Sequence, residues 1–345
     1  MIENTDSIVT SIPNVKVQAV AERVLRQFQL TAYKVAAHHG APSRFPLPTD
    51  STATEHLLAA RFKMLNDAQK KQAMDRVATS LKDSAGRARQ FSDLAKINLA
   101  SATPIESLVR GLPLPQRLKF PASELGKVSA VAVKENVSAA AAVPLKKLAL
   151  RIHSVKCVDE TGEWGEDEIY LGGTSVDESG DTGKISAFKV GDFNDGGLRR
   201  YMPPRQFTWF DLVEGSVKFP RSYFVTLVLA EVDWGGFAKF LNALLSTIQE
   251  QVTKAIAIAI GTVIGQRGGV VGRIIEEAVH WTLSKLFDYL RSLWSDDVFK
   301  PVTARVVVPS TTSRWASKNI SPERTVQYVG HGGAYRLTYD WHMFI

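Results

Sequence analysis

The first third of the chain carries the hydrophobic spacing of amphipathic helices. Apolar side chains recur there at intervals of three and four residues, which places them on one helical face. Residues 40–50 interrupt the pattern with three prolines and are expected to form a loop. Capping-box patterns, in which a hydroxyl and a carboxylate satisfy the first backbone amides of a helix, begin at Thr52 and Thr103. The pattern predicts a helical bundle over residues 1–127, with three of its helices at 14–38, 53–82 and 86–98.

From Leu148 onward the hydrophobic period changes to two. Polar and apolar residues alternate over short runs separated by Gly, Asp and Pro, as in the strands of an antiparallel sandwich. We therefore expect a β-sandwich over residues 146–345, and residues 128–145, rich in Ala, Val and Ser, are predicted to link it to the helical bundle. The clearest strand is at the C-terminus, where the large apolar side chains share one face: Tyr335, Leu337, Tyr339, Trp341 and Met343.

One segment inside the β region has a helical period instead. Isoleucine or valine recurs every four positions over residues 248–264, and a second apolar stripe covers residues 271–293. The glycine-rich residues 265–272 lie between the two stripes. This pattern predicts a helical hairpin over residues 236–294, inserted into the sandwich, and an α+β fold class for the whole chain.

Acidic residues follow the predicted strands on both sides of the hairpin. Residues 148–170 read LALRIHSVKCVDETGEWGEDEIY, and residues 225–235 read VTLVLAEVDWG, a strand ending in Glu-x-Asp. After the hairpin come residues 295–299, SDDVF, and another β run. With the hairpin left out, this order of strands and acidic loops resembles a C2 domain, a β-sandwich whose loops bind calcium. The resemblance covers residues 148–345 and implies a C2-like sandwich.

The resemblance also implies a calcium site at one end of the sandwich. Calcium takes six to eight oxygen ligands in a tolerant geometry, and clustered carboxylates supply such oxygens. The chain departs from the family pattern at Glu231, where the family has aspartate, and at Glu168, where it has proline. The alternative interpretation is that these acids are solvated turn residues. The implied calcium ligands are Asp159, Asp167, Glu231, Asp233, Asp296 and Asp297.

The first helix of the hairpin ends in a stretch, residues 255–265, that is apolar on all sides. Such a helix is buried either in protein or in lipid, and glycines four positions apart allow close packing, as in membrane helix pairs. One hypothesis is that the hairpin enters a membrane; the other is that it packs on the sandwich or on the N-terminal bundle. The candidate membrane or partner contacts are Ile256, Ile260, Gly261, Ile264, Gly265 and Gly269.

Composition and charge narrow the function classes. The 345 residues carry a net charge of +7, all of it within residues 1–145. The basic residues are scattered rather than clustered with aromatics, so nucleic acid is not an expected partner. The single cysteine, Cys157, excludes a disulfide scaffold and is expected in the core. The sequence has no nucleotide-binding, serine-hydrolase or zinc-protease motif, so neither an enzyme nor a small-molecule substrate is expected.

These features leave three functional hypotheses. The first is a non-enzymatic binding protein whose acidic loops bind calcium and dock on membrane lipid. The second is a toxin or effector whose hairpin inserts into membranes and which an export machine delivers. The third is a structural or interaction protein that binds another protein. The start of the chain lacks the pattern of a signal peptide, so we expect a cytoplasmic protein or one exported by a signal-peptide-independent route.

Overall fold

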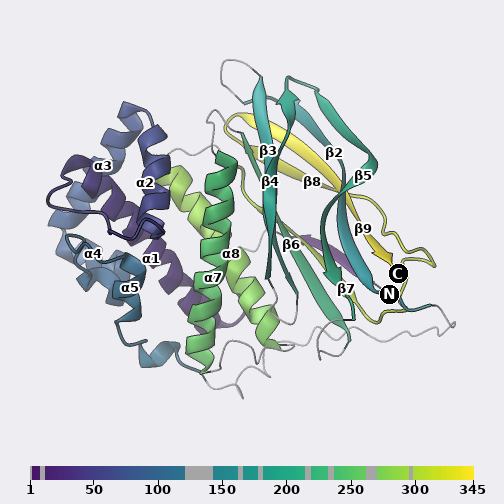
Figure 1. The fold of residues 1–345 in the computed structure, drawn as a ribbon, viewed down its shortest axis with the longest axis horizontal. Coiled ribbons are helices and arrows are strands. Elements are labelled where there is room, and N and C mark those ends of the chain that lie inside the picture. The colour runs from purple at the N-terminus through teal and green to yellow at the C-terminus, as the bar shows by residue number, and fades with distance from the viewer. Residues whose placement is uncertain are drawn as a thin grey trace.

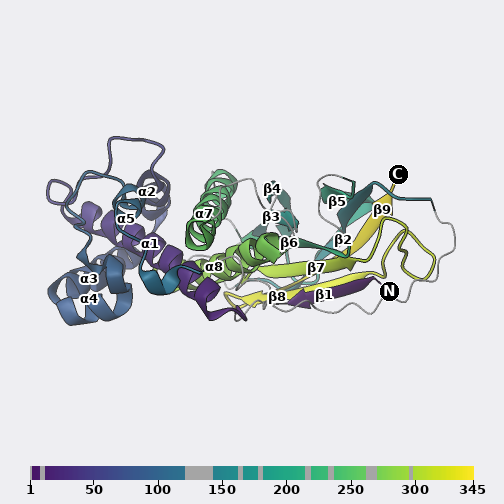
Figure 2. The same ribbon diagram turned by 90° about the horizontal axis from the view of Figure 1, so that it is seen from below.

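Two groups of helices and two β-sheets are stacked in four layers. The N-terminal helices lie at the left of Figure 1, the helical hairpin beside them, and the two sheets at the right. The perpendicular view in Figure 2 shows the same order of layers. The predicted α+β class is confirmed, because a helical region precedes two antiparallel sheets. The computed structural model describes residues 2–7, 12–120, 143–161, 166–177, 182–213, 219–231, 237–261, 270–294 and 298–345.

The outermost layer is the predicted helical bundle. Its helices are α1 (Val15–Gly40), α2 (Thr54–Met64), α3 (Asp67–Lys82), α4 (Ser84–Phe91) and α5 (Ile105–Arg110). The sequence predicts one helix over residues 53–82, but the structure has two. Leu65 leaves the helix in an extended conformation, and Asn66 caps α3. The Asn66 side chain accepts from the backbone amide of Gln69, whose own side chain accepts from the amide of Asn66, both at 2.9 Å. This capping box restarts the helix in a new direction.

The two capping boxes predicted at Thr52 and Thr103 do not form. The Thr52 hydroxyl donates to Asp50 at 2.7 Å, and the N-caps of α2 and α5 are Ala53 and Pro104, which make no side-chain cap. Asp50 competes for the hydroxyl from two residues away, an Asx turn that the capping pattern does not take into account.

Glu55, predicted to cap its own helix, instead joins three elements of the bundle. Its buried carboxylate accepts the backbone amide of Ile105 at the start of α5, at 2.7 Å. The ammonium group of Lys34, on α1, lies 3.8 Å from this carboxylate and donates to the carbonyl of Ser101 at 2.7 Å. Burial lowers the pKa of Lys34, and Glu55 opposes that shift. A buried charge needs such a partner, so the pair fixes how α1, α2 and α5 meet.

The remaining layers are the two sheets and the hairpin. The five-stranded sheet has the order β1-β7-β6-β3-β4, the four-stranded sheet the order β5-β2-β9-β8, and every pairing is antiparallel. The inner faces of the two sheets form one apolar core that contains all five alternating residues predicted for the C-terminal strand. The strands are β1 (Glu3–Ser7), β2 (Lys147–Asp159), β3 (Asp167–Asp177), β4 (Thr182–Phe193), β5 (Leu198–Asp211), β6 (Arg221–Glu231), β7 (Val302–Val308), β8 (Arg324–Gly330) and β9 (Gly333–Phe344).

Strand β1 lies in a part of the chain for which the sequence predicts helices. Residues 1–127 are expected to be helical, yet Glu3–Ser7 pairs along β7 at the edge of the five-stranded sheet. The segment ENTDS has no apolar alternation that could identify it as a strand. Its conformation comes from the free backbone edge of β7, which accepts any extended segment that reaches it. Most of the predicted linker lies outside the described residues.

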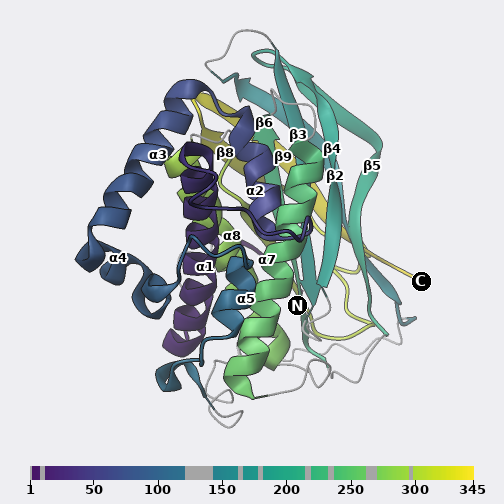
Figure 3. The same cartoon turned by 60° about the vertical axis from the view of Figure 1, so that its left-hand side comes forward.

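The predicted hairpin consists of α7 (Phe237–Ile260) and α8 (Val270–Trp294). Figure 3 shows both helices between α1 and the strands of the five-stranded sheet. The second apolar core of the molecule contains side chains of the bundle, of both hairpin helices and of the outer face of this sheet, where Val228 and Ala230 contribute from β6. The side chain of Asn242 on α7 also accepts the backbone amide of Ala187 on β4, at 2.9 Å. The hairpin is therefore an internal layer that packs on both neighbours.

Candidate functional site

The topology brings the ends of several acid-bearing strands to one end of the sandwich. Ile169 on β3 pairs with Glu231 on β6, and Asp167 starts β3 two residues earlier. Asp159 ends β2, directly before the loop that leads into β3. Asp167 and Glu231 therefore lie on adjacent strands of the five-stranded sheet, and Asp159 lies on a strand of the four-stranded sheet. The other three implied calcium ligands, Asp233, Asp296 and Asp297, lie outside the described residues.

The carboxylate of Asp167 is already occupied by protein donors. It is buried, and its two oxygens accept the backbone amide and the hydroxyl of Thr161, at 2.8 Å and 2.7 Å. The hydroxyl of Tyr335 on β9 donates to it as well. Burial, followed by the hydrogen bond to Asp167, raises the pKa of Tyr335 far above its ordinary value, so the hydroxyl stays a donor. This arrangement joins the two sheets and leaves Asp167 little capacity for a metal.

The other described acids do not complete a metal site. Asp159 is exposed and Glu231 is buried. Across the described ranges no group of three or more His, Cys, Asp or Glu side chains is arranged to hold a metal ion. Cys157 is buried in the sandwich core, where the sequence predicts it. Burial raises the pKa of its thiol.

The hairpin residues proposed as membrane or partner contacts divide into two groups. Ile256 and Ile260 are buried in the core shared with the bundle, and Gly261 ends α7 with a φ of +73°, a conformation that favours glycine. Ile264, Gly265 and Gly269 lie outside the described residues. No helix in the described part of the chain combines the length and apolar character that crossing a bilayer requires.

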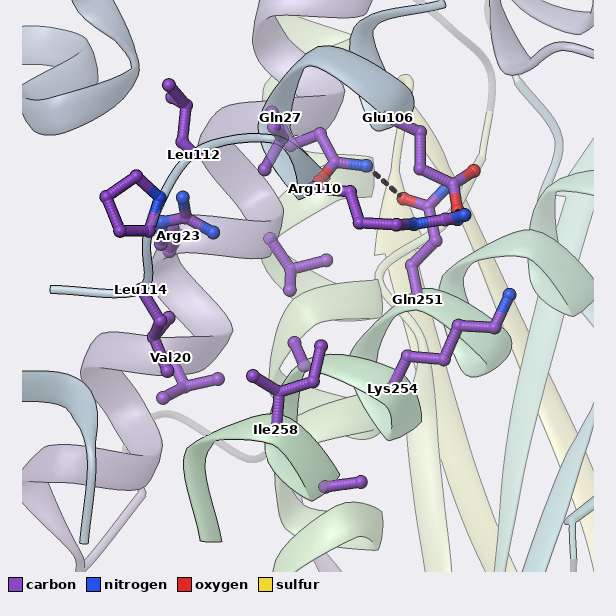
Figure 4. Close-up of a pocket in the computed structure, with 15 residues that line it drawn as sticks. Val20, Arg23, Gln27, Glu106, Arg110, Leu112, Leu114, Gln251, Lys254 and Ile258 are labelled. Atoms are coloured by element: carbon purple, nitrogen blue, oxygen red, sulfur yellow. Dashed lines mark hydrogen bonds and ion pairs between the residues drawn. The ribbon is translucent and has the colours of Figure 1, made fainter. Parts of the chain in front are cut away.

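A cavity of about 620 Å³ opens between α1, α5 and α7. Figure 4 shows the side chains of Leu112, Leu114, Val20 and Ile258 on one side of it, and a polar group around Gln251 on the other. The amide of Gln27 donates to Gln251 at 2.7 Å, and that residue donates to Glu106 at 3.1 Å. The full lining is Val20, Arg23, Val24, Gln27, Glu106, Val109, Arg110, Leu112, Pro113, Leu114, Gln251, Lys254, Ala255, Ala257 and Ile258.

A cationic strip crosses the outer face of the four-stranded sheet. It consists of Lys156 on β2, Arg336 on β9 and Arg200 on β5, all exposed. Lys156 pairs directly with Arg336 across the two strands, and Arg200 pairs with Ser154, two positions from Lys156. Like charges at directly opposed positions repel and destabilise a sheet. None of the three cations makes an ion pair with a carboxylate among the described residues.

Exposed apolar residues border the cationic strip at the same end of the sheet. Leu198 on β5 pairs with Lys156 and is 45% exposed. Val329 on β8 lies two residues beyond Gln327, the partner of Arg336, and is 64% exposed. Val158 on β2 is also exposed. Cations next to exposed apolar side chains are the composition of surfaces that bind anionic membranes.

The sequence reasoning missed both the cationic strip and the cavity. Arg336 alternates with the apolar residues of the predicted C-terminal strand, but the strip depends on the register that sets Lys156 opposite it. The cavity is built by three helices far apart in the chain. The alternation of β2 and β9 was a signal for the strip, since it predicts which cations share a face.

Comparisons of the chain with protein-family models, with curated proteins and with solved structures gave no match.

Proposed function

We propose that this protein is a non-enzymatic binding module that docks on anionic membrane surfaces through the cationic strip. The observation that carries the proposal is the direct pairing of Lys156 with Arg336, with Arg200 beside them and no described carboxylate as partner. A sheet tolerates opposed like charges at a cost in stability. An anionic surface removes that cost, because its charges lie against all three cations at once.

Membrane lipid is the partner that this surface fits best. The strip lies on the face of a sheet, so its cations can approach a flat surface together, and each basic residue near an anionic leaflet contributes about 1 kcal/mol. Leu198 and Val329, which border the strip, are exposed and apolar, and such side chains can enter the lipid interface. Asp340, the acid on β9, is neutralised by Arg151 at 2.8 Å and 2.6 Å, whereas Asp159, three residues beyond Lys156 on β2, is exposed.

This proposal keeps the membrane part of the first sequence hypothesis and separates it from calcium. Binding through cations needs no metal, whereas binding through the acidic loops does. Calcium binding stays a prediction, because half of the implied ligands lie outside the described residues.

The test is co-sedimentation with vesicles of phosphatidylcholine alone or with phosphatidylserine, each in calcium and in chelator. We expect binding only to the vesicles with phosphatidylserine, equal in both solutions and weakened by salt, because salt screens exposed charges. The double variant Lys156→Glu with Arg336→Glu is expected to bind at least about tenfold more weakly. Lys184→Glu, at an exposed lysine on β4 of the other sheet, is the control matched in charge to Lys156→Glu alone.

Two results would contradict this proposal. Binding that requires calcium would show that the acidic loops, and not the cationic strip, bind the membrane. Binding that the double variant retains in full would exclude the strip, and leakage of vesicle contents in that case would favour the toxin hypothesis.

A further inference from the structure

We propose that a bulge in β5, formed by residues 201–204, enters the lipid interface when the cationic strip docks, with Met202 as its apolar anchor. The inference rests on the proposed function, because the bulge belongs to the same membrane-binding surface. Strand β5 is the edge strand of the four-stranded sheet and lies on the side of the molecule away from the helices (Figure 1). The strip residue Arg200 lies two positions before Met202 on this strand.

The register between β5 and β2 creates the bulge. Ile152 on β2 pairs with Arg205, and Ser154 pairs with Arg200. Between these two pairs a single residue of β2 therefore lies opposite residues 201–204 of β5. Extra residues in one strand of a pair bend that strand and leave the ladder. The bulge is thus a local feature of the sheet edge that presents its side chains differently from the rest of β5.

Both ends of the bulge are held by the sandwich, while its middle is exposed. Tyr201 is half-buried and packs against the sandwich core, and the guanidinium of Arg205 lies 3.7 Å from the ring centroid of Phe188 on β4. Between them, Met202 is 90% exposed and Pro203 is also exposed. Proline on an edge strand prevents further strands from pairing, but that role does not need an exposed methionine beside it. A flexible thioether side chain on the surface is typical of binding sites for apolar partners.

Arginines flank the bulge on both sides. Arg199 and Arg200 precede it, Arg205 follows it, and all three are exposed. None of them makes an ion pair with a carboxylate among the described residues. Guanidinium groups bind phosphate oxygens strongly, and stacking on an aromatic ring is compatible with that role. In a membrane the phosphates lie directly outside the apolar region, so an apolar segment between arginines matches the order of groups in an anionic leaflet.

The single cysteine of the chain makes the insertion directly measurable. Cys157 is buried, so a cysteine introduced at an exposed position is the accessible one. Met202→Cys and the control Met64→Cys, at a 51% exposed position on α2, are each labelled with an environment-sensitive fluorophore. Each labelled protein is mixed with vesicles of phosphatidylcholine and phosphatidylserine, with or without bromine atoms on the acyl chains as quenchers.

We expect the label at position 202 to shift to shorter wavelengths on vesicle binding and to be quenched by the brominated chains. The label at position 64 should show neither effect. Met202→Ser removes the apolar group without adding a charge and is expected to weaken co-sedimentation by about tenfold. Met202→Leu and the control Met64→Ser are expected to bind as the wild type does.

The outcomes separate this inference from the membrane proposal. If the protein sediments with the vesicles but the label at position 202 is neither shifted nor quenched, insertion of the bulge is overturned and docking through the strip stands. The same holds if Met202→Ser binds as well as the wild type. Equal quenching at positions 64 and 202 would also overturn the insertion of the bulge. If the wild type does not bind vesicles with phosphatidylserine, both proposals fail.

Discussion

At the residue scale, single side chains show where stability and binding compete. Lys156 is the clearest case, since it lies opposite Arg336 on β9. An opposed pair of unlike charges stabilises a sheet, and a like pair destabilises it. When an exposed residue lowers the stability of the fold, a role in binding explains its presence better than a role in stability.

We predict that Lys156→Glu makes the protein more stable and less able to bind membranes. The new carboxylate faces Arg336, so the free energy of unfolding should rise by about 0.2–1 kcal/mol. Urea denaturation measures this change, and vesicle co-sedimentation measures the loss of binding. Lys156→Gln should lie between the wild type and Lys156→Glu, both in unfolding free energy and in vesicle binding. A Lys156→Glu variant that is less stable than the wild type would contradict the repulsion argument.

The role of Asp167 can be separated from metal binding by one substitution. Asp167→Asn replaces an acceptor of three hydrogen bonds with an amide, so we expect a loss of about 2–4 kcal/mol in unfolding free energy. The loss should be the same in calcium and in chelator, because Thr161 and Tyr335 are the partners. A loss that appears only in calcium would show instead that this carboxylate binds the metal.

At the element scale, the hairpin is a structural layer. Its helices join the bundle to the five-stranded sheet through one continuous core. The periodicity that suggested a membrane hairpin is equally the pattern of a helix buried on several sides. Here the surroundings are protein, since α1 covers one side of the hairpin and β3, β4 and β6 cover the other (Figure 3).

We predict that Ile256→Ala destabilises the folded protein by about 2–5 kcal/mol, the usual range for a buried isoleucine. Ile258→Ala, two residues along the same helix, should change stability little, because that side chain is exposed. Thermal unfolding of the two variants provides a matched comparison. Equal effects would mean that α7 does not pack as described.

At the scale of the whole molecule, we expect the junction between hairpin and sheet to be sensitive to acid. His280 on α8 is buried and contacts the hydroxyl of Thr226 on β6. Burial lowers its pKa from 6.5 to about 3. The unfolded chain therefore takes up a proton between these values that the folded chain excludes, and stability falls as pH falls through this window.

We predict that stability declines below about pH 6.5 with a contribution from His280 of about 1.4 kcal/mol per pH unit. Urea unfolding at about pH 7 and pH 5 measures the decline. His280→Asn keeps a polar group beside Thr226 but does not titrate, so its unfolding free energy should depend less on pH. An identical pH dependence in both proteins would exclude His280 as the source.

The sequence by itself determined the fold class and the elements that carry a strong hydrophobic period. Period-two alternation identified the faces of β9, and period-four spacing identified both helices of the hairpin, because burial on one face imposes its period on the chain. Predictions from local sequence patterns were wrong where a group distant in the chain provided a different partner. Glu55 left its predicted cap for the start of α5, and β1 is a strand only because β7 offers a free edge.

Only the tertiary structure decided what lies together. The layer that buries α7, the cavity lined by Arg23 and Ile258, and the pairing of Lys156 with Arg336 each join segments far apart in the chain. A sequence pattern records which side of an element is buried, but not which partner buries it. Strand register and helix docking depend on the sum of many contacts across the molecule, and both proposed sites are products of that sum.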